Sequence, residues 1–195
     1  MNITLRKPNF VYETVAPTSK SAAHRMMIAA AFADAPTRMR LSGAGEDIAA
    51  TLRVLKALGA GAEMTSEKAN EWLYITPISA PVHGAIADCG ESGSTLRFLV
   101  PVAAALGTDT TFLRRGRLPE RPMEPLTSEL LRHGVVCTDN ADGSLSVTGK
   151  LAAGAYSIAA NVSSQFITGL LFALSLLRRS VLLDFYRLWR YNDYV

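Results

Sequence analysis

The stretch Glu91-Ser92-Gly93-Ser94-Thr95 is a hydroxyl-rich loop that runs directly into an apolar helical pattern. Two further stretches have the same character, Thr18-Ser19-Lys20-Ser21 and Val162-Ser163-Ser164-Gln165. A helix start leaves backbone N–H groups unpaired and carries a partial positive charge, so small hydroxyl residues there can hold phosphate or carboxylate oxygens. Each loop is therefore a candidate anion site, although a serine before a helix can also serve as its N-cap.

An arginine follows two of these loops at helical spacing. Arg25 comes four residues after Ser21, and Arg97 comes four residues after Gly93. This spacing returns each guanidinium to the helical face of its own loop one turn later. The two arginines are candidate anion ligands, although a single arginine on a helix is more often simply solvated.

Two further cations lie near these loops. Lys20 is inside the first loop, and Arg121 is in the Gly/Pro-marked segment 114–122. Arginine grips carboxylate or phosphate with a planar fork, whereas lysine is a point charge whose pKa can fall when it is desolvated among other cations. Lys20 is therefore the candidate for proton transfer, and the set as a whole predicts binding of small polyanions.

The elements predicted along the chain occur twice in the same order. The first copy has a helix and two strands, at 46–58, 62–64 and 72–75. The second copy has a helix with Leu126, Leu130 and Leu131, then strands at 135–137 and 144–147. With the upstream helices, each unit is predicted to run strand, helix, strand, helix, strand, strand. We predict an α/β fold with two complete βαβαββ units and a third begun.

The composition excludes several classes of protein. The chain has 195 residues, 49% hydrophobic and 19% charged, with a net charge of +3, which suits a globular domain with one sizeable core. Its cations are scattered, which argues against a nucleic-acid groove. Cys89 and Cys137 stand far apart, so we expect reduced cysteines of a cytoplasmic protein and neither a metal site nor a redox motif. The longest apolar stretch, 166–177, is too short to span a bilayer, so no membrane partner is expected.

Four motifs together resemble the 5-enolpyruvylshikimate-3-phosphate (EPSP) synthase family. They are the SKSxxxR opening at 18–25, the glycine- and serine-rich loop at 88–97, the Arg-Pro loop at 118–123 and the SSQF helix start at 163–166. They occur in the family's order and spacing, and they cover roughly residues 5 to 178.

The resemblance implies a fold of two lobes, each built inside-out from three βαβαββ repeats, with the substrates bound between them. Residues 16–179 would form most of one enolpyruvyl transferase-like lobe, and residues 1–15 would belong with the missing lobe. Residues 180–195 depart from the repeat, and we interpret them as a truncated or frame-shifted tail. The resemblance also implies a monomer.

The resemblance further implies transfer of the enolpyruvyl group of phosphoenolpyruvate to the 5-hydroxyl of shikimate 3-phosphate, without a metal or cofactor. By matching position, the residues for shikimate 3-phosphate would be Lys20, Ser21, Arg25, Ser163, Ser164 and Gln165. Those for phosphoenolpyruvate would be Lys20, Gly93, Arg121 and Gln165. Lys20 would take part in proton transfer, and Arg97 would support the site. Other acid-base residues of the family lie beyond this chain, so we expect little or no turnover from the chain alone.

Two alternatives remain open at this stage. The sister enolpyruvyl transferase that acts on UDP-N-acetylglucosamine shares the repeat fold, but it carries a cysteine where this chain has Gly116. The second alternative is a non-catalytic lobe that binds anions. His24, His83 and His133 are too dispersed to suggest a metal site, and His24 is expected to serve packing or a local hydrogen bond.

Overall fold

The computed structural model describes residues 19–41, 43, 45–67, 70–159, 161–177 and 181–186. The helices are α1 (Lys20–Ala31), α2 (Glu46–Ala57), α3 (Gly93–Leu106), α4 (Leu126–Arg132) and α5 (Ser164–Leu176). The strands are β1 (Thr37–Leu41), β2 (Gly61–Glu67), β3 (Asn70–Thr76), β4 (Ile86–Asp88), β5 (Thr110–Leu113), β6 (Val135–Asp139), β7 (Leu145–Gly149), β8 (Ala155–Ala159) and β9 (Leu182–Tyr186). The fold class is α/β, as the sequence predicts.

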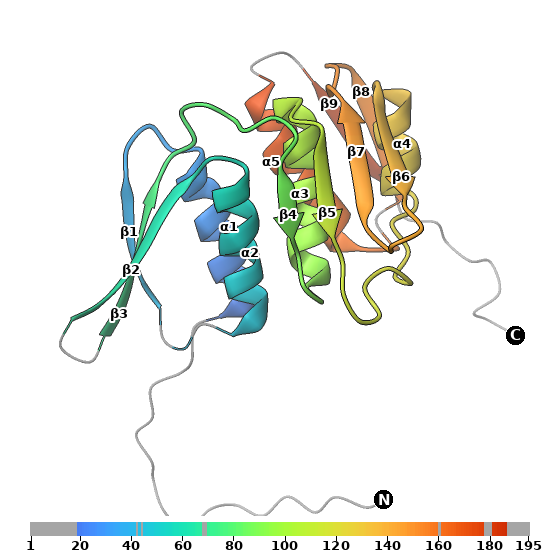
Figure 1. Ribbon diagram of the computed structural model, residues 1–195. Coiled ribbons are helices and arrows are strands. Elements are labelled where there is room, and N and C mark those ends of the chain that lie inside the picture. The colour runs from blue at the N-terminus through green and yellow to red at the C-terminus, as the bar shows by residue number, and fades with distance from the viewer. Residues whose placement is uncertain are drawn as a thin grey trace, which may run out of the picture.

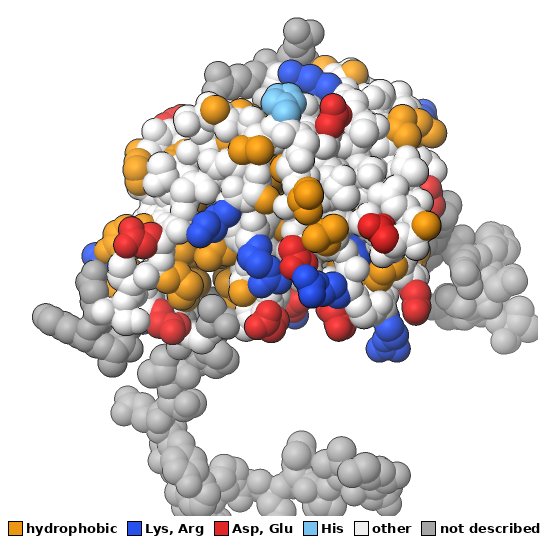
Figure 2. Space-filling model, in the orientation of Figure 1, with side chains coloured by type: hydrophobic (Ala, Val, Ile, Leu, Met, Phe, Trp, Pro, Cys, Tyr) orange, Lys and Arg blue, Asp and Glu red, His pale blue; other side chains and the backbone are white. Residues whose placement is uncertain are grey.

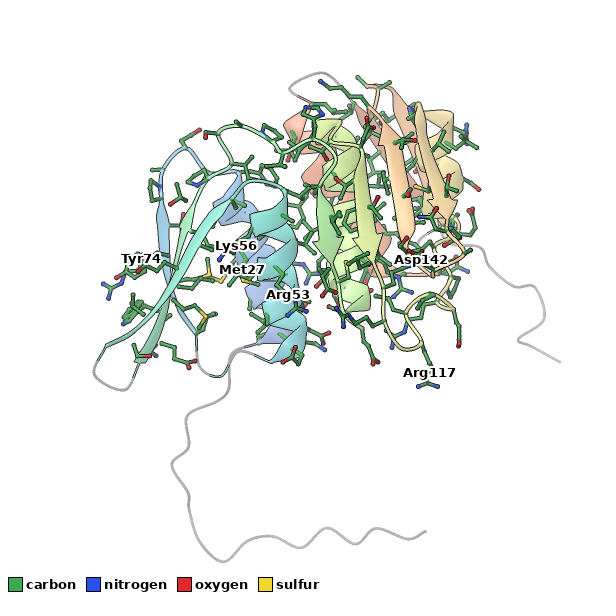
Figure 3. All side chains as sticks on the ribbon, in the orientation of Figure 1. Met27, Arg53, Lys56, Tyr74, Arg117 and Asp142 are labelled. Atoms are coloured by element: carbon green, nitrogen blue, oxygen red, sulfur yellow. The ribbon has the colours of Figure 1, made fainter. Side chains whose placement is uncertain are left out.

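The first unit forms a three-stranded antiparallel sheet in the order β1-β3-β2, with α1 and α2 against one face (Figure 1). Met39 of β1 pairs with Leu73 of β3, and both are buried. Successive strand residues point to opposite faces, so the neighbouring Tyr74 lies on the other side. Figure 3 shows Tyr74 directed away from the helices and Met27 of α1 on the helix side. The sheet therefore has one core face and one outer face.

The second unit contains all six predicted elements, in the order β4, α3, β5, α4, β6 and β7. Its sheet has the order β4-β5-β7-β6, with β4 parallel to β5 and β7 antiparallel to both β5 and β6. The order β5-β7-β6 reproduces the order β1-β3-β2 of the first unit, which confirms that the units repeat. The first strand predicted for the first unit falls in residues 1–18, outside the described residues.

The third unit begins with β8, α5 and β9. Strands β8 and β9 are parallel, as β4 and β5 are in the second unit. Strand β9 lies inside the segment 180–195 that the sequence sets apart as a tail, and it takes the position of the second strand of the third unit. Residues 1–15 and 187–195 lie outside the described residues, so their assignments stay predictions.

Helix α4 is enclosed on one side only. Leu126 and Leu130 are buried, whereas Leu131, predicted on the same helix, has 59% of its surface exposed. Contacts of α4 are with β6 and β8, so the residue that turns away from both strands faces solvent. None of the helices in the described ranges is long and apolar enough to cross a membrane.

Helices α3 and α5 approach each other closely at Gly169 of α5. A side-chain carbon at this position would clash with the carbonyl oxygen of Arg97, and it would lie 3.2 Å from Cα of Phe98. Both neighbours are backbone atoms of α3, which cannot swing aside. The glycine therefore sets the separation of the two helices, and with it the placement of the α5 start beside the α3 start.

We predict that Gly169→Ala destabilises the chain by about 1–3 kcal/mol, the usual cost of forcing extra volume into a packed contact. Alanine has the better helix propensity, so a loss of stability would come from the contact itself. Urea denaturation measures the free energy of unfolding. Leu171→Ala is the control on the same helix, because Leu171 is 56% exposed and its truncation should change stability by about 0.5 kcal/mol or less. An unchanged midpoint for Gly169→Ala would contradict the tight contact.

Candidate functional site

Helices α1, α2, α3 and α5 begin at the same end of the fold. Lys20 at the start of α1 donates to the Asp47 carboxylate in the first turn of α2, over 2.7 Å. Thr95 in the first turn of α3 donates to the Asp47 backbone carbonyl over 3.3 Å. Gln165 at the start of α5 donates to Ser94 of α3 over 2.7 Å. Because every helix start carries a partial positive charge, this end of the fold favours anions.

Arg97 and Arg121 lie together over the first residue of α3. A side-chain carbon on Gly93 would be 3.0 Å from Nη1 of Arg121 and 3.3 Å from Nη1 of Arg97. The glycine therefore leaves room for both guanidinium groups. Burial, and after it the positive charge of Arg121, lowers the pKa of Arg97. Within the described ranges, neither arginine is paired with a carboxylate. Two neighbouring cations without counter-charges form a site for an anion.

The Gln165 side chain joins Arg97 to the α5 start. Its Oε1 accepts from Nη1 of Arg97 over 3.0 Å, while its Nε2 donates to the Ser94 hydroxyl. Nη2 of Arg97 donates to the Pro122 carbonyl over 3.3 Å, and its guanidinium lies 5.5 Å from the centre of the Phe166 ring. Arg97 therefore ties α3, α5 and the loop that carries Arg121 into one unit, which suits the supporting role expected for it.

Arg25 spans the first and third units. Its Nη1 donates to the Ser21 hydroxyl over 2.5 Å and to the Ser21 carbonyl over 2.8 Å. Its Nη2 donates to the Thr168 hydroxyl of α5 over 3.2 Å, and its guanidinium lies 5.2 Å from the Phe98 ring centre. Thr168 in turn donates to the Ser164 carbonyl over 3.1 Å. The structure thus brings Ser21, Arg25 and the start of α5 together, as predicted from sequence.

Lys20 is exposed along most of its side chain, and Asp47 holds its ammonium group. The hydrogen bond from Lys20 holds the pKa of Asp47 below its usual range, and a further hydrogen bond from the Ser92 hydroxyl acts in the same direction. Asp47 therefore stays ionised and fixes the Lys20 ammonium at the edge of the site.

One serine of each hydroxyl-rich loop caps its helix. Ser19, Ser92 and Ser163 accept from the backbone N–H groups of Ala22, Thr95 and Gln165 respectively. The N-cap interpretation is therefore correct for these three oxygens. A hydroxyl that accepts through its oxygen still has a hydrogen to donate, so capping by Ser163 is compatible with the phosphate contact expected of it. Ser21 and Ser164 are not caps, and both are exposed.

The loop that carries Arg121 is anchored at its start by the buried Arg114. Nε of Arg114 donates to the Gly143 carbonyl over 2.7 Å. Its Nη2 donates to the Asp139 carboxylate over 2.5 Å and to the Ser144 carbonyl over 3.1 Å. Arg114 is therefore structural, because its donors are used by the turn that joins β6 to β7.

The same loop is fastened to β4 by a second set of contacts. Arg115 donates to the Asp88 carboxylate over 3.0 Å. Gly116 has a φ of 55°, which favours glycine, and a side-chain carbon there would lie 2.5 Å from the Glu91 carboxyl group. These contacts fix the loop next to the start of α3, where Arg121 is needed.

A hollow of about 520 Å³ lies beside the start of α2, and its positive side chains are paired with carboxylates. It is lined by Glu46, Arg53, Asp88, Gly90, Glu91 and Arg115. Its cations face carboxylates, since Arg53 lies 3.9 Å from Glu46 and Arg115 pairs with Asp88. Figure 3 places Arg53 on α2, and Figure 2 shows side chains of both signs interleaved along the lower edge of this face. This hollow has less net attraction for anions than the unpaired arginines over Gly93.

Asp47, Ser94 and Thr168 contribute to the site but are absent from the predicted set. Ser94 belongs to a recognised loop, so its position could have been included. Asp47 is an acidic residue in the first turn of a predicted helix, which signals only a favourable helix start. Thr168 sits one turn after Ser164, and its contact with Arg25 depends on how α5 packs. The part of the chain that the structure describes contains no group of three His, Cys, Asp or Glu residues that could hold a metal ion.

Comparisons with known proteins give a consistent result. The family model of EPSP synthase (3-phosphoshikimate 1-carboxyvinyltransferase) matches residues 6–182. A 3-phosphoshikimate 1-carboxyvinyltransferase of Clostridium kluyveri is 41% identical over 167 residues, which are 83% of this chain and 37% of that protein. Its counterpart in Clostridium beijerinckii is 39% identical over 175 residues, 85% of this chain and 39% of that protein. The chain thus spans less than two-fifths of the length of these relatives.

Solved structures agree. An EPSP synthase from Acinetobacter baumannii superposes with a TM-score of 0.65 at 26% identity, covering 82% of this chain and 37% of that one. The enolpyruvyl transferase NikO from Streptomyces tendae, at 17% identity, superposes with a TM-score of 0.51 over 85% of this chain and 36% of that one. This second likeness concerns the fold alone.

His24 gives the fold a predicted sensitivity to acid. The ring is 1% exposed, and burial lowers the pKa of His24, with Lys20 and Arg25 acting in the same direction against Asp47. Below the ordinary histidine pKa of about 6.5, His24 therefore binds a proton in the unfolded chain but stays neutral in the folded chain. We predict that the free energy of unfolding falls as the pH drops from neutral through this region.

Urea denaturation across that pH range checks the prediction. The His24→Asn chain cannot titrate at this position, so its stability should fall less steeply than that of the wild type. The exposed His83→Asn is the matched control and should keep the wild-type slope. Identical slopes for wild type and His24→Asn would contradict a neutral, buried ring.

Proposed function

Because the chain belongs to the EPSP synthase (3-phosphoshikimate 1-carboxyvinyltransferase) family, we propose that it supplies the substrate-holding half of an enolpyruvyl transferase site. In the proposed reaction the 5-oxygen of shikimate 3-phosphate bonds to C2 of phosphoenolpyruvate, and the bond from C2 to the phosphate oxygen breaks. The methylene carbon of phosphoenolpyruvate gains a proton in the addition step and loses one in the elimination step. The 5-hydroxyl loses its proton as its oxygen attacks, and inorganic phosphate leaves with the equivalent of that proton.

The observation that carries the proposal is the pair of guanidinium groups over Gly93. Both substrates are polyanions, and Arg97 and Arg121 lack carboxylate partners among the described residues. We assign the phosphoenolpyruvate side of the site to Gly93, Arg121 and Gln165. Arg97 holds the Gln165 amide in place.

We assign shikimate 3-phosphate to the neighbouring groups on α1 and α5, which are Ser21, Arg25, Ser163, Ser164 and Gln165. Support comes from the bridge between Arg25 and Thr168, which places an arginine beside the hydroxyls at the α5 start. Lys20 precedes Ser21 at the start of α1 and is bound to Asp47 of α2, and we assign it to contact both substrates. Its ammonium is the group assigned to proton transfer, because arginine does not give up its proton in this pH range. The chemistry asks the site to position two anions and to stabilise developing charge.

A non-catalytic anion-binding lobe is the second candidate function. It is favoured by one observation, that apart from Lys20 the assigned groups can bind anions but cannot exchange protons at neutral pH. The chain spans 37% of the Clostridium kluyveri relative, so groups that complete the reaction would come from outside it. We therefore propose that this chain alone binds the substrates and turns them over slowly or not at all.

The sister activity on UDP-N-acetylglucosamine has less support. The loop of Arg121 offers no thiol, and the Glu91 carboxyl group occupies the space beside Gly116. Burial raises the pKa of Cys89 to about 12, so that thiol is a poor nucleophile. We propose a cytoplasmic location, which two unpaired cysteines fit. We also propose that the protein is a monomer.

Calorimetric titration of the purified chain with shikimate 3-phosphate tests the substrate assignment. We expect Arg25→Ala and Ser164→Ala each to weaken binding by about tenfold, or about 1.4 kcal/mol. Arg117→Ala is the matched control, because Arg117 is exposed, belongs to neither assigned substrate set and projects from the loop between β5 and α4 (Figure 3). Equal affinities for all four chains would refute the assignment.

A steady-state assay of phosphate release tests whether the chain alone turns the substrates over. Substrate binding without turnover is expected of the chain alone. A rate that scales with chain concentration and disappears in Lys20→Met would overturn the proposal that further groups are needed.

A further inference from the structure

A buried row of polar side chains connects α1, α2 and α3 behind the site. Nδ1 of His24 lies 2.6 Å from the Thr51 hydroxyl, which lies 2.7 Å from the Thr95 hydroxyl. Thr95 donates to the Ser92 hydroxyl over 2.8 Å. The exposed fractions of these four residues are 1%, 0%, 0% and 2%. The row reaches Asp47 at its backbone carbonyl, which lies 3.3 Å from the Thr95 hydroxyl, and the Ser92 hydroxyl helps to keep the pKa of the Asp47 carboxyl low.

One direction of donation lets every contact in this row be a hydrogen bond. A threonine hydroxyl has one hydrogen, and we assign that of Thr95 to the Ser92 oxygen or the Asp47 carbonyl, toward which it is the donor, rather than to Thr51. The Thr95 oxygen must therefore accept from Thr51. Thr51 has then used its only hydrogen, so its oxygen must accept from His24. The donor to Thr51 can only be an N–H on Nδ1 of the imidazole.

The remaining ring nitrogen agrees with this assignment. Nε2 of His24 is buried and has no hydrogen-bond partner among the described residues. The edge of the ring lies against Phe98, with the ring centres 6.1 Å apart. An unpaired N–H is rarer in protein interiors than an unpaired acceptor, so a bare lone pair is the less costly state of Nε2. A second proton, which would charge the ring, is unfavourable beside Lys20 and Arg25, the cations that lower the pKa of His24.

We infer that His24 is held as the neutral Nδ1–H tautomer and acts through Thr51, Thr95 and Ser92 as a positioning residue for Lys20. The row runs in one direction and ends at Asp47, whose carboxylate holds the Lys20 ammonium over 2.7 Å. Because the hydroxyl of Thr95 contacts the Asp47 backbone, the row limits the movement of Asp47 at the start of α2. The importance of Lys20 rests on the proposed function, but the tautomer and the hold on Lys20 do not.

The first arm of the test is the state of the ring. The chain has three histidines, so long-range 1H–15N NMR of the imidazoles can be assigned with His24→Asn. The expected result is a proton on Nδ1 and none on Nε2 of His24 near neutral pH. An Nε2–H tautomer or a charged ring would overturn the inference, and neither depends on substrate binding.

The second arm measures the hold on Lys20. Site-resolved acylation of lysines, read by mass spectrometry, should be about threefold faster at Lys20 in Thr51→Val, as expected for weakening a half-exposed ion pair. Thr51→Ser keeps the hydroxyl and should keep the wild-type rate. Lys150 lies far from α1 in the chain and serves as the internal control. An unchanged Lys20 rate in a folded Thr51→Val chain would mean that the row is only structural.

His24 variants supply an independent check if Thr51→Val does not fold. The side-chain NH2 of asparagine occupies nearly the position of Nδ1, so His24→Asn can still donate to Thr51 and should keep the wild-type Lys20 rate. His24→Leu cannot donate, and it should show the faster rate. Equal acylation of the two variants would overturn the positioning role. Wild-type tautomer and acylation results without any substrate binding would instead count against the proposed function alone.

Discussion

The close contact of α5 with α3 at Gly169 is the constraint on which the site depends. The contact lies one turn after Gln165 and beside Thr168, so the same packing that brings the two backbones together also delivers both side chains to arginines of other elements. A wider helix separation would leave the serines of the third loop distant from those of the second. The repeat places three similar helix starts in one chain, and this contact makes two of them neighbours.

The distribution of counter-charges distinguishes the two arginines over Gly93 from three other arginines nearby. Arg114, Arg115 and Arg53 face Asp139, Asp88 and Glu46 respectively. These arginines serve the structure, because each positive charge is already balanced. Arg97 and Arg121 lie against one another at the start of α3, a position that costs electrostatic energy unless an anion joins them. This repulsion between Arg97 and Arg121 occurs where the helix starts lie together.

Much of the fold could be predicted from sequence because the signals were local and repeated. Helix stripes, glycine stops and hairpin turns recur at matching places, and the structure has the same strand order in both units. The exposure of Leu131 and the placement of β9 in the presumed tail could not be predicted, because both depend on which other helices and strands pack against these elements. Residue type and spacing likewise pointed to arginines and serines that the structure brings together at the helix starts. The partners Asp47 and Thr168 lie 27 and 143 residues from the side chains they touch, and no local pattern reports such distances.

The unbalanced arginines also bear on how fast a ligand arrives. Charges that are not cancelled locally extend their field into solvent, and such a field steers oppositely charged molecules toward its source. The encounter rate for a doubly charged anion should therefore exceed that for a neutral molecule of the same size. Ions in solution shorten the reach of the field to about 8 Å at physiological ionic strength, so salt slows this capture more than it loosens the bound state. Because no described carboxylate pairs with Arg97 or Arg121, these arginines are expected to speed the arrival of an anion as well as to favour its binding.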